Sequence, residues 1–84
     1  MQEKTYNGWT NYQTWNVALW IENQRFLYTT AVNFMKNYTG TSPYKDYIKY
    51  MHLSNQKTLD DVKWNDSTLN HIELNQLMNE FKEI

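Results

Sequence analysis

Apolar residues recur three and four positions apart in several separate segments of this 84-residue chain. That spacing brings them onto one face of an α-helix, which turns about 100° per residue. The alternation of apolar and polar residues that indicates a strand never persists beyond a few residues, and the chain has only two Gly and one Pro to interrupt helices. We therefore predict an all-α protein, folded as one compact domain over residues 1–84.

The spacing predicts four helices, over about residues 11–23, 25–38, 43–53 and 68–82. The first is apolar around most of its circumference, which favours a central position with neighbours on several sides. Gly40 is placed to end the second helix, and Ser42 followed by Pro43 is a start signal for the third. Three residues can each cap the last helix: Asp66, Ser67 and Asn70. We expect one core built from Trp15, Leu19, Leu27, Phe34, Ile48, Leu74, Leu77 and Phe81.

The segment N-G-W-T-N-Y-Q-T-W, residues 7–15, has the features of a helix start. Asn7 and Gly8 form a turn signal, because both residues tolerate positive φ. Thr10 and Gln13 match the capping box, in which a hydroxyl accepts from the first turn and the residue three positions later bonds back to the cap. We therefore predict that Thr10 caps the first helix.

The longer stretch N-G-W-T-N-Y-Q-T-W-N-V-A-L-W-I-E-N, residues 7–23, resembles the opening of a family of small uncharacterised proteins carried by bacteriophages, plasmids and related mobile elements. Their openings are similar to NGWTNYxTWxVxLW, followed shortly by aromatic or leucine residues and a tyrosine, here Phe26, Leu27 and Tyr28. The later V-K-W-N-D and L-x-x-L-M-x-E-F segments also resemble that family. The resemblance implies a helical protein encoded by a phage or mobile element, and it brings no catalytic residues.

The patterns that accompany catalysis or metal binding are missing from the sequence. His52 and His71 fall on separate predicted elements, and neither lies in a metal-binding spacing. The acids around Asp60 lack the spacing and glycine of a calcium loop, and two glycines cannot supply a phosphate-binding loop. Glu22 and Glu73 have no partner that the sequence can place for acid–base chemistry. We predict a protein that is not an enzyme and uses no cofactor.

The chain has no Cys, no basic segment followed by an apolar run at its start, and no apolar stretch long enough for a bilayer, which suggests a cytosolic location. Together with the phage or plasmid origin that the resemblance implies, this predicts the cytoplasm of a bacterial host. A membrane is therefore not an expected partner.

Aromatic residues are the strongest indication of a binding role. The chain has four Trp, seven Tyr and three Phe, more than a four-helix domain of this length readily covers. Four lie outside the predicted apolar faces and are candidate anchors for a partner: Tyr6, Trp9, Tyr50 and Trp64. In the competing interpretation, Trp9 and Trp64 fold back over the ends of helices. Together with the family resemblance, the aromatic surface favours a protein that binds a host protein, such as a defence or replication factor, and modulates or inhibits it.

Two alternatives remain open. The predicted third helix carries Lys45, Lys49 and His52 on one side with Tyr50 nearby, a pattern that suits phosphates and bases. From Arg25 to Lys57 there are five basic residues and one acid, whereas the whole chain has a net charge of −1 and a single Arg, so nucleic acid is a less favoured partner than protein. The second alternative is a homodimer in which two copies cover the aromatic face.

Overall fold

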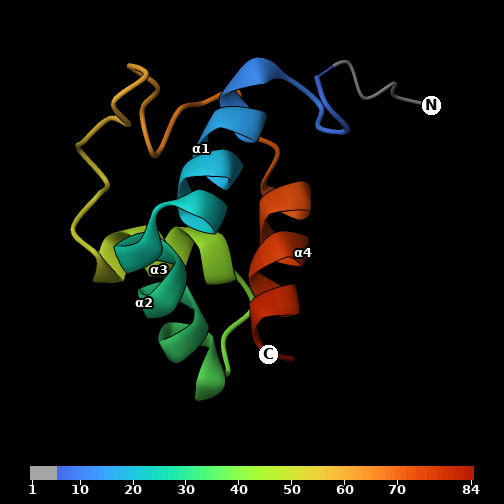
Figure 1. The fold of residues 1–84 in the computed structure, drawn as a ribbon, viewed down its shortest axis with the longest axis vertical. Helices are drawn as coiled ribbons and strands as arrows, with labels where there is room; N and C mark the ends of the chain where they lie inside the picture. Colours follow the sequence, from blue (N-terminus) through green and yellow to red (C-terminus); the bar gives the residue numbers. More distant parts are fainter. Residues whose placement is uncertain (1–5) are drawn as a thin grey trace.

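The computed structural model describes residues 6–84 of the chain and shows four α-helices in a compact arrangement (Figure 1). They are α1 (Tyr12–Asn23), α2 (Arg25–Lys36), α3 (Pro43–Tyr50) and α4 (His71–Phe81). Within residues 6–84 there is no strand, and the only β-type pairings are two isolated bridges, Tyr6 with Trp9 and Lys57 with Lys63. The predicted all-α class and the four helices are confirmed.

The helix boundaries follow local signals, with some differences from the prediction. Gln24 alone separates α1 from α2: its backbone N–H donates to the Trp20 carbonyl, and its side chain accepts from the Leu27 N–H. Helix α2 ends at Lys36, two residues before the predicted end at residue 38. Gly40 is needed for another reason, because a Cβ at this position would collide with the Tyr38 ring.

The third and fourth helices also begin where the sequence has a start signal. Helix α3 begins at Pro43 after Ser42, as predicted, although the Ser42 side chain makes no capping bond. Asn70 is the residue that caps α4, and its side chain accepts from the Glu73 N–H.

Helix α1 is not the central helix. It packs against α2 and α4 but makes no contact with α3, whereas α2 and α4 each contact all three other helices. The apolar residues on the outer side of α1 are covered by loops and by each other. Trp15, for example, packs against the rings of Tyr6 and Tyr12, with centroids 4.8 and 5.7 Å away.

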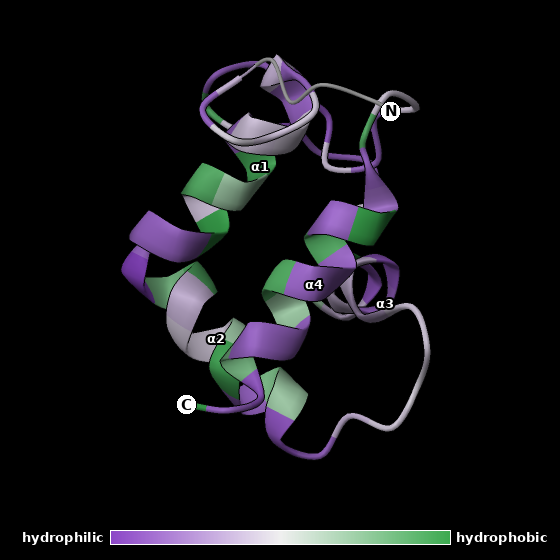
Figure 2. Ribbon diagram, turned by 90° about the vertical axis from the view of Figure 1, so that its right-hand side faces the viewer, coloured by the Kyte–Doolittle hydropathy of each residue, from purple (hydrophilic) through white to green (hydrophobic). Residues whose placement is uncertain are grey.

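The core is only partly the predicted one. Ile48, Leu74, Leu77 and Phe81 are buried in it, and Leu27 and Phe34 lie at its edge. Trp15 and Leu19 lie outside it, because α1 turns a different face inward: Val17, Ala18 and Ile21 are fully buried. In Figure 2, α1, α2 and α4 each carry both apolar and polar segments, as expected for helices with one buried face.

Two tyrosines from α3, Tyr44 and Tyr47, are fully buried in the core. The Tyr44 hydroxyl donates to the Trp64 carbonyl oxygen at 2.5 Å, and the Tyr47 hydroxyl donates to the Leu27 carbonyl oxygen at 2.8 Å. These bonds satisfy both hydroxyls away from water. Burial raises the pKa of both phenols, so they remain neutral donors. Trp64 itself is only 3% exposed and is part of the core.

The long segment between α3 and α4 is a packed loop, and one buried amide holds it on α1. Asn16 is fully buried; its Nδ2 donates to Asp60 Oδ2 at 2.8 Å, and its Oδ1 accepts from the Thr58 hydroxyl at 2.7 Å. The Trp20 indole N–H donates to the same Asp60 oxygen at 2.9 Å. These two bonds, from Asn16 and Trp20, lower the pKa of Asp60.

We expect Asn16→Ala to lower the free energy of unfolding by about 2–4 kcal/mol, because it removes two hydrogen bonds and leaves the Thr58 hydroxyl buried without its acceptor. Urea denaturation measures the change. Asn79→Ala, at an exposed position of α4, is the matched control and should change stability by less than about 0.5 kcal/mol. Equal losses in the two variants would contradict a clamping role for Asn16.

Candidate functional site

A tight turn precedes α1 and fixes the position of Trp9. The Tyr6 N–H donates to the Trp9 carbonyl oxygen at 3.0 Å, and the Trp9 N–H donates to the Tyr6 carbonyl oxygen at 2.7 Å. Asn7 and Gly8 have φ values of 48° and 90°, as a two-residue Asn-Gly turn requires. The predicted turn is confirmed. It holds the Trp9 side chain between α1 and α4.

The capping residue of α1 is Asn11, so the prediction for Thr10 is wrong. The Asn11 side chain accepts from the Thr14 N–H at 2.8 Å. Thr10 lies one residue earlier and bonds to the start of α4 instead. Its N–H donates to Glu73 Oε1 at 3.0 Å, and its hydroxyl accepts from the Asn70 side chain at 2.8 Å.

Further bonds join the same two helix ends. The Asn70 N–H donates to the Thr14 hydroxyl at 3.0 Å, and the Asn11 side chain donates to the Thr68 carbonyl oxygen at 2.8 Å. The N-terminal ends of α1 and α4 are therefore tied together by polar side chains on both sides. We call this set of contacts the polar junction: Thr10, Asn11, Thr14, Thr68, Asn70 and Glu73.

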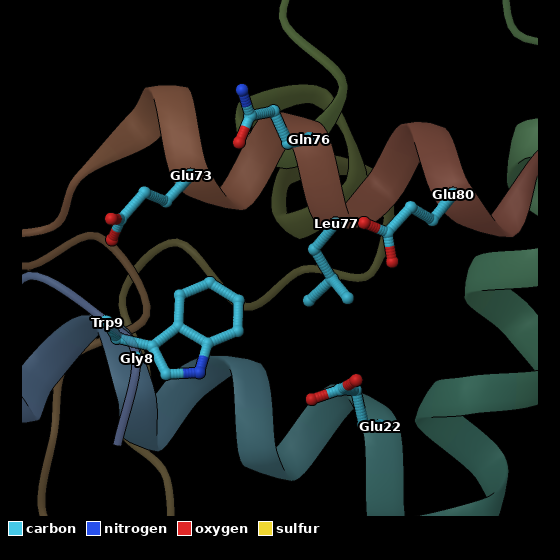
Figure 3. Close-up of a pocket in the computed structure, with 7 residues that line it drawn as sticks. All are labelled: Gly8, Trp9, Glu22, Glu73, Gln76, Leu77 and Glu80. Atoms are coloured by element: carbon cyan, nitrogen blue, oxygen red, sulfur yellow. The ribbon is translucent and has the colours of Figure 1, made fainter. Parts of the chain in front are cut away.

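A groove of about 270 Å³ opens between α1 and α4 next to the polar junction (Figure 3). We call it the α1–α4 groove; its lining residues are Gly8, Trp9, Glu22, Glu73, Gln76, Leu77 and Glu80. Figure 3 shows the Trp9 indole across from Leu77, with Glu22 on α1 and Glu80 on α4 at the same end. Glu73 lies at the other end, in the first turn of α4, where the helix dipole favours a carboxylate.

The carboxylates give the groove a negative potential. Burial in the groove raises the pKa of Glu22, and the nearby charge of Glu80 raises it further. Within residues 6–84, neither Glu22 nor Glu80 has an ion-pair or hydrogen-bond partner for its side chain. Two carboxylates that repel each other beside an indole ring form a site suited to a positively charged group.

The predicted anchor residues do not converge on one site. Tyr6 is half-buried against Tyr12 and Trp15, and Trp9 is half-buried in the α1–α4 groove. Tyr50 is 63% exposed on α3 and is not among the residues that line this groove. Trp64 is buried, so its predicted surface position is wrong. The Trp64 ring is instead folded back onto the helices, as the competing interpretation predicts.

The basic residues proposed for nucleic acid are exposed. Lys45 and Lys49 lie on α3 one turn apart, and His52 follows the helix with a positive φ of 60°. Sequence reasoning did not find the pairing of Glu22 with Glu80. Neither residue belongs to a local motif, and only the packing of α1 against α4 brings them together.

Residues 6–84 contain neither a metal-binding cluster nor a membrane-spanning helix. Among these residues there is no group of three or more His, Cys, Asp or Glu side chains that could hold a metal ion. None of the helices described there has the length and apolar character needed to cross a membrane.

Residues 2–84 match the model of a family of unknown function, DUF7249. No curated protein and no solved structure matches the chain. The family match thus covers nearly the whole chain, and the family has no assigned activity.

We expect Glu22→Gln to raise the free energy of unfolding at pH 7, because it removes the repulsion from Glu80 and the cost of burying a charge. The raised pKa means that the folded state binds this proton more tightly than the unfolded state does. Stability therefore falls as the pH rises from about the ordinary value of 4.5 through the folded pKa. The gain from Glu22→Gln should be full above this range and should vanish below it.

Urea denaturation of both proteins at pH 7 and near pH 4 measures this difference. Glu83→Gln, at an exposed position outside the groove, is the control for the loss of one negative charge. An equal gain at both pH values would assign the effect to packing and contradict the electrostatic explanation.

Proposed function

The chain belongs to DUF7249, and we propose that it is an interaction protein, encoded by a phage or mobile element, that acts in the bacterial host cytoplasm by binding a host protein. Its activity is binding without chemistry. The α1–α4 groove is the surface that receives the partner, and the group it receives is a lysine or arginine side chain.

The observation that carries this proposal is the placement of two carboxylates, Glu22 and Glu80, beside an indole ring in one groove, with no side-chain partner for either among residues 6–84. A cationic head lies between Glu22 and Glu80 and offsets the repulsion between the two carboxylates. The aliphatic stem of the same side chain packs on Leu77, as long basic side chains commonly do on apolar surface. The face of Trp9 adds a cation–π contact, worth about 0.5–2 kcal/mol depending on its exposure to water.

The groove is also held in one shape before anything binds. Two backbone bonds fix the turn that carries Trp9, and the polar junction fixes the ends of α1 and α4. A site whose side chains are already ordered loses less conformational entropy on binding. This supports recognition of a particular segment over a diffuse attraction between opposite charges.

The chemistry of the groove supports an inhibitory role. Basic side chains on replication and defence proteins commonly contact the phosphates of nucleic acid. A carboxylate-lined groove that binds such side chains competes with nucleic acid for the same surface. We propose that the protein inhibits its host partner in this way.

Photo-crosslinking at a single position tests the proposal. A photoreactive amino acid replaces Gln76, which lines the groove, and the protein is irradiated in the cytosol of a bacterial host. We expect a covalent adduct with a host protein, formed through a lysine- or arginine-containing segment that mass spectrometry identifies. The same replacement at Asn79, exposed on α4 outside the groove, is the matched control and should give no such adduct.

The double variant Glu22→Gln, Glu80→Gln should lose the adduct while remaining folded, because neither side chain belongs to the core and the change removes the repulsion between them. Equal labelling from positions 76 and 79 would contradict the groove as the binding surface. An adduct with a second copy of the chain would replace the host-protein proposal with the homodimer.

A further inference from the structure

A second groove, of about 340 Å³, lies between α2 and α3 and differs from the first in both charge and lining. We call it the α2–α3 groove; it is lined by Thr30, Asn33, Phe34, Asn37 and Tyr50. No ionisable carboxylate or amine lines it. Its lining consists of aromatic rings, amides and the hydroxyls of Thr30 and Tyr50.

The aromatic rings form a continuous surface. The centroid of Phe34 lies 5.2 Å from that of Tyr50 and 5.2 Å from that of Tyr38. Tyr50 is 63% exposed, and Phe34 is partly exposed beside it. Exposed rings of this kind are platforms on which other flat groups stack.

The amides provide directed hydrogen bonds next to these rings. Asn33 and Asn37 are four residues apart, which puts them on the same side of α2 and at its end. Both are exposed, and within residues 6–84 neither side chain has a hydrogen-bond partner. An asparagine amide offers a donor and an acceptor together, which matches the edge of a nucleobase.

Exposed cations lie on the two helices that form the groove. Lys36 lies three residues after Asn33 on α2, and Lys49 lies immediately before Tyr50 on α3. Both lysines are exposed. The same two helices carry two further exposed cations, Arg25 and Lys45. Asp46 is the single carboxylate on these helices, and it accepts a hydrogen bond from the Tyr38 hydroxyl at 2.6 Å. A polyanion is therefore attracted to α2 and α3 and repelled by the α1–α4 groove.

We propose that the α2–α3 groove binds single-stranded nucleic acid. One base stacks on Tyr50 and Phe34, its edge bonds to the Asn33 and Asn37 amides, and Lys36 and Lys49 contact the flanking phosphates. A duplex does not fit this chemistry, because its bases are already stacked and paired. With so few cations, the binding is moderate and strongly dependent on salt.

Fluorescence anisotropy with labelled single strands, DNA and RNA, of about 20 nucleotides tests the proposal. We expect binding at about 50 mM salt that weakens about sevenfold at 200 mM, as two phosphate contacts on a single strand predict. Tyr50→Ala should weaken binding about tenfold without lowering the melting temperature, because the ring is mostly exposed. Nuclear magnetic resonance should show the Asn33 and Asn37 side-chain amides shifting during the titration.

Two variants serve as controls. Tyr12→Ala, which removes a ring that is 37% exposed on α1, should bind as the wild type does. The double variant Glu22→Gln, Glu80→Gln should also bind at least as well, so failure of the proposed protein-binding function and failure of this one are distinguishable. Equal affinity for a duplex of the same sequence, an unchanged affinity in Tyr50→Ala, or no binding at about 50 mM salt would each overturn the proposal.

Discussion

The polar junction between the starts of α1 and α4 is the constraint on which much of the structure depends. Asn11 and Asn70 each cap their own helix and also bond to the other segment, through the Thr68 carbonyl oxygen and the Thr10 hydroxyl. Such double use satisfies one free N–H group at each of the two helix starts, that of Thr14 and that of Glu73, and sets the spacing of the helices. That spacing brings Glu22 to Glu80 and opens the α1–α4 groove beside Trp9.

A second set of polar contacts covers a side of α1 that no other helix reaches. Four short helices leave one side of α1 without a helical neighbour, and the loop between α3 and α4 covers part of it. Asn16 fixes that loop by bonding to Thr58 and Asp60 at once. Fully satisfied networks of this kind hold a chain segment in one position, whereas apolar contacts alone tolerate sliding. The cost is that both amide atoms of Asn16 must keep their partners.

The charges of the chain are separated by the fold into two surfaces. The acids of α1 and α4 meet in one groove, whereas α2 and α3 carry exposed cations and form another groove that is lined by rings and amides. The acidic groove is suited to a positively charged partner, and the surface of α2 and α3 is suited to a negatively charged one. The small net charge of the whole chain does not reveal this separation. A protein that binds basic side chains at one groove and a nucleic-acid strand at the other would act where the two occur together.

The sequence by itself determined the helices, because the signals that form a helix act within one or two turns. The apolar spacing, the Asn7-Gly8 turn, the break at Gln24 and the start at Ser42 and Pro43 are all local. Where two adjacent residues could each cap a helix, tertiary contacts decided which of them does so. Asn11 caps α1 because the adjacent Thr10 is engaged by Asn70 and Glu73, which lie sixty residues and more along the chain.

The same reason explains the other differences. Whether α1 buries Trp15 and Leu19 or Val17 and Ile21 depends on how closely α2 and α4 approach, and the apolar pattern of α1 permits both. Trp64 stands in a polar loop, yet Tyr44 binds its carbonyl and the core encloses its ring. Glu22 and Glu80 form a site only because α1 packs against α4. The two residues are far apart in the sequence, so no local sequence pattern indicates that their carboxylates lie close together.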